Sequence, residues 1–518
     1  MFHFRLSYWP LCPLMRSAKP VFARPVQRKI TMHERGSLAD LQSRYGTRHR
    51  WLMLTTVMIG SMAAIMSSTI MNVGIPDMSL QFGIGQERAQ WVSSSFMIAM
   101  TVSMLTTPWL LARFGYRATY MGCMLLLLSA GVAGGLSNDY NLVLICRVAE
   151  GLAAGVVQPI PAIIILRAFD TAEQGRANSF FGMGVVLAPA IGPSIGGVLV
   201  DWLSWRSLFF MVVPLCLASM WLAIRYVPTT APGGVSANHG KPPLDIAGLA
   251  LATVGTLCLL NGLVLLHSGE WVYSFSLIGV SMLSALGFVV WQRMQTQHGG
   301  MPLMNLALFA HRPFAMGTTV AFIYGIAMFG STYLIPVYLQ LGLGLSPSHV
   351  GTLLLPAGLL LAVTIAFVGR YSSTHPTHLM VSFGLVLLAL SFGLMLIVNL
   401  QTSLWVLVVL AILGRVGLGF ILPSLNIGAM RGMNAELITQ GASAINFLRM
   451  LGGAAGVSLC GILLEWRLAA HGDTLTNATK STARLAAFDE VFLMLTLVCL
   501  LALLAAWQIR PPRSHPTH

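Results

Sequence analysis

The stretch GMGVVLAPAIGPSIGGVLVDW, residues 182–202, holds one charged side chain, Asp201, in 21 residues. A run of about 20 apolar residues is long enough to cross the hydrocarbon of a bilayer as a helix. Gly192 and Gly196 share one helical face, on which a neighbouring backbone can approach closely. Pro189 and Pro193 each remove a helix hydrogen bond and favour a bend. The stretch therefore predicts a membrane-spanning helix that packs tightly against another helix.

The composition of the whole chain agrees with this prediction. Its 518 residues include 30 Lys+Arg and 16 Asp+Glu, which is 9% charged, whereas 56% are apolar. A soluble domain carries about 25% charged residues, so this chain cannot cover a large soluble surface. The seven cysteines are sparse, show no CxxC or Cys/His spacing, and argue against a disulfide-stapled or metal-binding chain. The fold class that follows is an all-α polytopic membrane protein, because lipid requires backbone groups to be paired within each segment.

Fourteen apolar segments are long enough to span a membrane. Their approximate ranges are 52–76, 90–112, 117–136, 141–166, 177–200, 206–228, 245–267, 273–292, 314–340, 349–369, 378–400, 404–430, 440–464 and 489–509. The polar start lacks the continuous apolar core of a signal peptide. We expect the mature chain to begin at Met1 or, with 1–31 as an upstream extension, at Met32.

The placement of basic residues predicts the orientation. With the N-terminus in the cytoplasm, 22 of the 30 Lys+Arg fall in inside segments, five fall outside, and Arg147, Arg415 and Arg449 lie within spans. This bias predicts that both termini are cytoplasmic. It also explains the net charge of +14 as a signal of topology and anionic lipid, so we expect no nucleic-acid partner.

Features of the first six spans recur in the last six after about 260 residues. The pairs are Gly192 and Gly196 with Gly452 and Gly456, Pro76 with Pro336, Arg147 with Arg415, and Arg113 with Arg370. Two helical repeats around a central site are typical of transporters. We therefore divide the chain into a basic cytoplasmic segment 1–50, a six-helix half 51–228, an inserted helix pair with its loops 229–313, a second six-helix half 314–509 and a cytoplasmic tail 510–518.

Several motifs resemble those of one family. APAIGPSIGG at 188–197 resembles the antiporter signature of the major facilitator superfamily, and Arg147-Val-Ala-Glu-Gly151 with Gly155 resembles its fourth-helix motif. TIMNVGIP at 69–76 resembles the first-helix motif of its fourteen-span drug–proton antiporters, the EmrB/QacA type. The segments WRSLF at 205–209 and LIPVYLQ at 334–340 also fit. The resemblance covers about 50–510, nearly the whole chain.

The resemblance implies the major facilitator fold and a function. It implies a secondary active exporter of drugs and other toxic amphipathic compounds, working by proton-coupled antiport and alternating access in the cell (inner) membrane. In double-membrane bacteria, similar proteins work with a periplasmic adaptor and an outer-membrane channel. The alternative is a protein that keeps the fold without coupling, as a facilitator, sensor or scaffold. No ATP-binding loop and no nucleophile–base–acid pattern occurs, so we expect neither an enzyme nor a cofactor.

The acidic residues depart from the family pattern at two positions. The family usually has an acid two positions before the Thr of its first-helix motif, where this chain has Ser67, and commonly has Gln where this chain has Glu150. Glu150 is the one acid in the interior of a predicted span, and Arg147 lies on the same helical face three residues earlier. An intramembrane carboxylate is costly and needs a partner or a cavity. Glu150 and Arg147 are therefore the candidate proton-coupling residues, either as a switch or as a static pair that holds the helix.

Two further groups of residues are candidates. Polar groups inside spans, which serve either as substrate contacts or as contacts between helices, are Asn72, Gln158, Tyr324, Gln340, Asn426, Asn446, Arg415 and Arg449. Residues of the motifs expected to govern the conformational change are Pro189, Gly192, Pro193, Gly196, Gly197, Arg113, Gly115 and Arg117.

Overall fold

The computed structural model describes residues 38–84, 86–229, 243–267, 270–372, 375–434, 436–472 and 482–509. The alternative start at Met32 and the tail 510–518 lie outside the described residues, as does most of the segment 1–50. The helices below belong to one compact unit, Gly36–His518.

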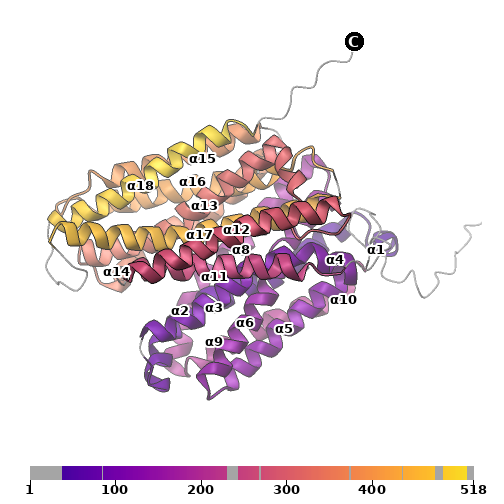
Figure 1. Ribbon diagram of the computed structural model, residues 1–518, viewed down its shortest axis with the longest axis horizontal. Helices are drawn as coiled ribbons and strands as arrows, with labels where there is room; N and C mark the ends of the chain where they lie inside the picture. The colour runs from indigo at the N-terminus through magenta and orange to yellow at the C-terminus, as the bar shows by residue number, and fades with distance from the viewer. Residues whose placement is uncertain are drawn as a thin grey trace, which may run out of the picture. The chain divides into compact units, whose positions relative to one another are not determined.

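The described residues form helices without strands (Figure 1). In chain order they are α1 (Leu38–Tyr45), α2 (Arg48–Phe82), α3 (Gln86–Ser103), η1 (Met104–Thr106), α4 (Thr107–Phe114), α5 (Tyr116–Leu136), α6 (Tyr140–Val157), α7 (Ile160–Ala168), α8 (Thr171–Trp202), α9 (Arg206–Phe210), α10 (Val212–Tyr226), α11 (Ile246–His267), α12 (Trp271–Gln297), η2 (Leu306–Ala310), α13 (Arg312–Val337), η3 (Tyr338–Gly342), α14 (Pro347–Tyr371), α15 (Thr377–Met395), α16 (Leu404–Met430), α17 (Ile438–Ala470) and α18 (Thr482–Ala506).

Thirteen helical runs of the described residues are long and apolar enough to cross a membrane, and each overlaps one predicted span. The remaining predicted span, 177–200, lies within α8, a continuous helix of 32 residues that is not among the thirteen. The all-α polytopic fold is thus confirmed. The second and fourth predicted spans are each divided into helices in series. Pro108 and Pro161 lie in the first turns of α4 and α7, where a missing backbone N–H is tolerated.

Equivalent helices pack in the same way in the first and second parts of the chain. We call α2–α10 the N-terminal helix group and α13–α18 the C-terminal helix group. Helix α2 packs on α8 as α13 packs on α17, and α3 packs on α6 as α14 packs on α16. A Cβ at Gly151 would approach Phe96, and 268 residues later a Cβ at Gly419 would approach Thr364. The repeat seen in the sequence is therefore also present in the packing.

The glycines of the quoted stretch lie at one of these equivalent contacts. A Cβ at Gly192 would be 3.3 Å from Thr69 Oγ1 of α2. In the C-terminal helix group, a Cβ at Gly452 would be 2.1 Å from the carbonyl oxygen of Phe322 in α13. The small residues allow α17 to lie directly against the backbone of α13, as the sequence predicts.

The two helix groups meet mainly at one end of the bundle. We call the end that holds Arg113, Arg167 and Arg370 the basic end. There Asn178 Nδ2 donates to Pro423 O at 2.9 Å, and Ser179 Oγ donates to Ile365 O at 2.6 Å. Helix α17 also contacts α4 and α7, which end there. These contacts hold the groups together at the basic end.

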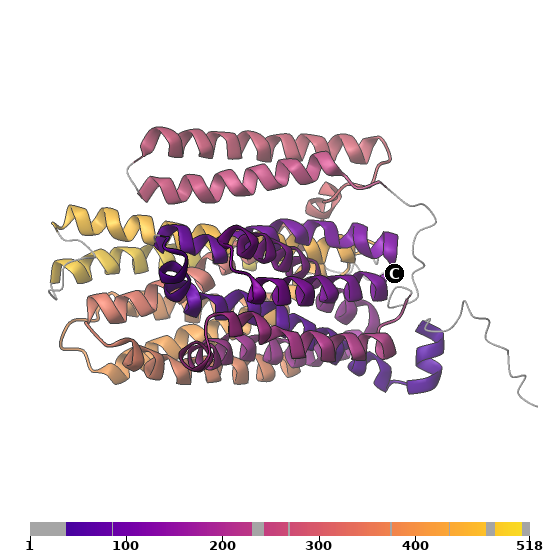
Figure 2. The ribbon, with the colours of Figure 1, turned by 90° about the horizontal axis from the view of Figure 1, so that it is seen from below.

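Helices α11 and α12 form a pair outside the two groups. Figure 2 shows them side by side along one face of the bundle. They pack on each other, and α11 alone makes extensive contact with the groups, through α17 and α3. The positions agree with an inserted pair between two repeats, although the exact division of the chain at 228 and 313 stays a prediction.

We predict that Gly452→Ala lowers the free energy of unfolding by about 1–3 kcal/mol, because the methyl group would overlap a main-chain carbonyl that cannot move freely. The control is Gly197→Ala, since a Cβ at Gly197 meets nothing within 4 Å. The measurement is thermal unfolding of each purified variant in detergent micelles. Equal unfolding temperatures for the two variants would contradict the packing described here.

Candidate functional site

An ion pair lies inside the N-terminal helix group. Arg147 and Glu150 face each other on α6, one turn apart, and Arg147 Nη1 donates to Glu150 Oε2 at 2.5 Å. Both residues have 0% exposure. Burying two charges is compensated only where the geometry is good and other hydrogen bonds are present. The pairing predicted from the spacing on one helical face is therefore present.

Ser67 of α2 completes this cluster. Its hydroxyl accepts a hydrogen bond from Arg147 Nη1 at 2.8 Å and donates one to Glu150 Oε2 at 3.2 Å. Ser67 is the position at which the family resemblance expects an acid. The carboxylate of Glu150 therefore lies beside the place where a first-helix carboxylate would lie, although it belongs to another helix.

The surrounding helices fix the arginine. Arg147 Nε donates to Val92 O of α3 at 3.0 Å, and its guanidinium lies 4.3 Å from the centre of the Phe96 ring. Gly131 of α5 makes room for the acid, because a Cβ there would lie 3.2 Å from Glu150 Oε1. Four helices thus form the cluster, so its hydrogen bonds connect α2, α3 and α6 directly.

Two buried polar atoms of the cluster make no hydrogen bond to any described residue. Within the described part of the chain, Glu150 Oε1 and Arg147 Nη2 are buried and have no hydrogen-bond partner. An unpaired carboxylate oxygen is a place where a proton can bind. Protonation would weaken the attraction to Arg147 and alter how α6 is held against α2 and α3. The contacts that hold α6 against α2 and α3 can therefore depend on whether Glu150 is protonated.

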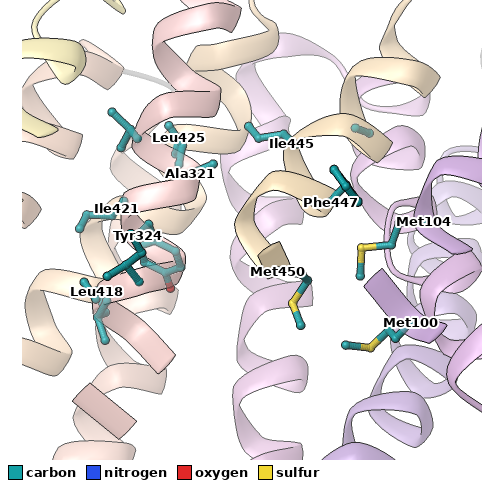
Figure 3. Close-up of a cluster of buried hydrophobic side chains, with 14 of the residues drawn as sticks. Met100, Met104, Ala321, Tyr324, Leu418, Ile421, Leu425, Ile445, Phe447 and Met450 are labelled. Atoms are coloured by element: carbon teal, nitrogen blue, oxygen red, sulfur yellow. The ribbon is translucent and has the colours of Figure 1, made fainter. Parts of the chain in front are cut away.

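Four of the predicted substrate contacts lie together in the C-terminal helix group. Arg449 Nη2 donates to Asn446 Oδ1 at 2.6 Å on α17. Arg415 of α16 and Arg449 both lie within electrostatic range of Tyr324, on α13. Tyr324 is buried, and Figure 3 shows it beside Leu418. These residues form a polar cluster among apolar side chains.

The other four predicted contacts are spread over the bundle. Asn72 is exposed on α2 and accepts a hydrogen bond from Ser93 Oγ at 2.6 Å. Gln158 is half-buried at the break between α6 and α7, Gln340 is half-buried in η3, and Asn426 is half-buried on α16. None of these four contacts the Tyr324 cluster among the interactions of the described residues, so their roles stay predictions.

The residues of the conformational motifs fall into two places. Pro189, Gly192, Pro193, Gly196 and Gly197 all lie in α8, whose Gly192 and Gly196 face α2.

The basic-end motif joins the α4–α5 turn to the end of α10. Gly115 has φ +79°, which favours glycine, and a Cβ there would be 2.6 Å from Thr229 O. Arg117 Nε donates to Val227 O at 2.7 Å, while Arg113 lies over the Trp109 ring at 5.6 Å.

Sequence reasoning missed three participants. Thr332 of α13 accepts a hydrogen bond from Arg415 Nη2 at 3.4 Å, and Asn178 and Ser179 of α8 contact the C-terminal helix group. Thr332 could have been found from the sequence, because it lies about one repeat length after Ser67. Asn178 and Ser179 had none, because a contact between distant helices leaves no local pattern. In the described part of the chain, no group of three or more His, Cys, Asp or Glu side chains is placed to hold a metal ion.

Comparison with known proteins assigns the chain to a family. The family model of the Major Facilitator Superfamily matches residues 57–457, about three quarters of the chain. The Multidrug export protein EmrB of Haemophilus influenzae is 26% identical over 82% of this chain and 82% of its own length. EmrB of Escherichia coli K12 is 25% identical over 83% of each chain, and the Lincomycin resistance protein LmrB of Listeria monocytogenes is 22% identical over 79% of this chain and 85% of its own. With its helical repeats and its motifs, this chain belongs to the Major Facilitator Superfamily.

Proposed function

We propose that this transporter exports toxic amphipathic compounds by proton-coupled antiport. The similarity to proteins named for multidrug export and lincomycin resistance supports an export role at low identity. The observation that supports proton coupling is the buried cluster of Glu150, Arg147 and Ser67, which holds a carboxylate oxygen without a hydrogen-bond donor.

In the proposed cycle, a proton arriving from outside binds Glu150 and releases it from Arg147. The neutral acid no longer holds α6 to α2 through charge-assisted hydrogen bonds, so the N-terminal helix group can rearrange. Loss of the proton to the cytoplasm restores the ion pair and resets the transporter. Each turn of the cycle thereby couples inward proton movement to outward substrate movement.

Alternating access requires the two helix groups to separate at the basic end. The excess of Lys and Arg supports a cytoplasmic position for this end and for both chain termini. The conformation described here, with α8 against α14 and α17 against α4 and α7, is then closed toward the cytoplasm. We further propose that the protein resides in the inner membrane. A periplasmic adaptor and an outer-membrane channel are proposed partners by analogy with similar exporters.

One observation favours the alternative of an uncoupled facilitator, sensor or scaffold. Arg147 and Glu150 are fully buried in the conformation described here, as a static pair would be. Proteoliposomes separate the two proposals. Antiport changes the luminal pH in fixed proportion to the substrate moved, whereas an uncoupled protein does not.

We predict that Glu150→Gln abolishes proton-driven export while the protein still folds and inserts. The amide keeps the shape and one hydrogen-bond acceptor but cannot bind and release the proton. Efflux of a fluorescent dye from energised cells measures the effect, and gel filtration of the purified variant checks folding. The control is Glu436→Gln, which changes an exposed acid at the turn before α17. Normal proton-driven efflux by Glu150→Gln would refute the coupling role.

A second prediction tests whether the position of the acid in space matters more than its position in the chain. In Ser67→Asp/Glu150→Gln, the carboxylate moves to α2 but stays beside Arg147, which lies 2.8 Å from the Ser67 hydroxyl. We expect this double variant to recover at least a tenth of the wild-type efflux rate. Ser67→Asn/Glu150→Gln, with the same shape and no acid, should recover none. Equal failure of both variants would show that α6 must hold the acid.

A third prediction concerns the contact between α8 and α14. A Cβ at Gly369 would lie 2.4 Å from Ser179 Cβ. A disulfide needs about 3.5–4.5 Å, so in Ser179→Cys/Gly369→Cys the two helices must move apart by more than about 1 Å before the bond forms. We expect oxidation to stop export and a reducing agent to restore it, because the basic end can no longer open. The controls are Ser179→Cys alone and the double variant kept reduced. Full export by the cross-linked protein would rule out opening at this contact.

A further inference from the structure

The two helix groups differ in how they neutralise an equivalent arginine. Arg415 follows Arg147 by 268 residues, and both donate a hydrogen bond to a hydroxyl on the first helix of their group, Thr332 and Ser67 respectively. The position equivalent to Glu150 is Leu418, which is buried. The C-terminal helix group has therefore kept the cation and lacks the anion that balances it in the N-terminal helix group.

A second arginine adds to this imbalance. Arg449 of α17 follows Pro189 of α8 by 260 residues, so the N-terminal helix group has no equivalent cation. No carboxylate of the described residues lies within 4.0 Å of Arg415 or Arg449. Along α17 the nearest acid is Glu465, 16 residues or about 24 Å away. Two positive charges thus share one region without a counter-ion.

The depth of these residues makes the imbalance costly. Tyr324 and Arg449 lie 12 and 11 residues from the basic-end starts of α13 and α17, about 17 Å into each helix. Arg415 lies 15 residues, or about 23 Å, from the basic end of α16. An arginine near the bilayer centre costs at least about 2.5–3.5 kcal/mol. Lipid headgroups lie near the membrane surfaces, about 15 Å from the midplane, so they are badly placed to supply the missing charge.

The site also has groups that suit a ligand. Arg415 and Arg449 are half-buried, in contrast to the fully buried Arg147. Within the described part of the chain, the hydroxyl of Tyr324 has no hydrogen-bond partner and is available as a donor.

Tyr324 belongs to a core cluster of buried apolar side chains that also includes Met100, Met104, Phe447 and Met450. Figure 3 shows Met450 of α17 and Met100 of α3 pointing toward each other, with Phe447 and Met104 close by. Methionine side chains adapt to apolar surfaces of different shapes.

We propose that Arg415, Arg449 and Tyr324 bind the anionic group of an amphipathic organic anion, so that the substrates include aromatic or alkyl carboxylates. The ligand's charge neutralises the arginines while its apolar part lies against the methionines. Arg415 supplies a guanidinium that donates one hydrogen bond to Thr332, and Arg449 supplies one that donates to Asn446. This inference rests on the proposed export function, of which it names the substrate class.

The experiment measures binding, so that it stands apart from coupling. The purified full chain in lipid nanodiscs is titrated with 1-naphthylacetate, 1-naphthylacetamide and 1-naphthylmethylammonium, which share a ring and differ in charge. We expect the anion to bind at least tenfold more tightly than the neutral and cationic probes. Arg415→Gln and Arg449→Gln should each lose most of this preference, and Arg449→Glu should reverse it. The lysine variants Arg415→Lys and Arg449→Lys should keep it.

Arg431→Gln, which removes an exposed arginine at the turn after α16, should bind all three probes as wild type does. Equal affinity of the wild type for the three probes would overturn the inference, as would an undiminished anion preference in the folded glutamine variants. If Glu150→Gln keeps the preference and loses export, both proposals stand. If the wild type prefers the anion but shows no proton-coupled export, the proposed function fails and the anion site remains.

Discussion

The rest of this structure depends on one constraint: a charged side chain inside a membrane has no water to solvate it. Lipid cannot solvate an ion, so each charged side chain within a span must find its partner inside the protein. Arg147 meets this requirement with Glu150, Ser67 and the Val92 carbonyl, and the three contacts join α2, α3 and α6. The hydrogen bonds of this cluster to Ser67 and to the Val92 carbonyl therefore also fix the relative positions of the helices. A change in the protonation of one carboxyl group acts on all of them at once.

The duplicated architecture shows how the two groups have diverged around this constraint. Small residues of α8 lie against side chains of α2, and small residues of α17 lie against the backbone of α13. Their polar side chains differ, since the N-terminal helix group holds a closed ion pair and the C-terminal helix group holds two arginines and a tyrosine. The packing of α17 tolerates little variation because it lies against the backbone of α13, whereas a polar side chain can be exchanged within the same space. This difference fits the proposed transporter, in which the N-terminal helix group would bind the proton and the C-terminal helix group would bind the substrate.

The sequence predicted the helices well and the polar contacts in part. Long apolar runs and proline or glycine at their ends specify spans almost independently of tertiary structure, so α16 begins and ends where predicted, at Leu404 and Met430. The Arg147–Glu150 pair was predictable because it depends on spacing within one helix. Asn178 and Ser179 were not, because their partners, Pro423 and Ile365, are main-chain carbonyls about 190 to 250 residues away. Likewise, Asn72 looked like a binding residue by polarity alone, yet it pairs with the nearby Ser93 on the exposed side of α2.

The neighbourhood of Ser67 and Glu150 has a consequence for how function is inferred across distant relatives. A search for an acid at the position of Ser67 alone would find none in this chain. It would group the protein with family members that lack a carboxylate for proton coupling. In three dimensions a carboxylate does lie beside this position: Glu150 of α6 accepts a hydrogen bond from the Ser67 hydroxyl and another from Arg147. Surveys that compare side-chain positions in space will recover such cases that column-by-column comparison discards.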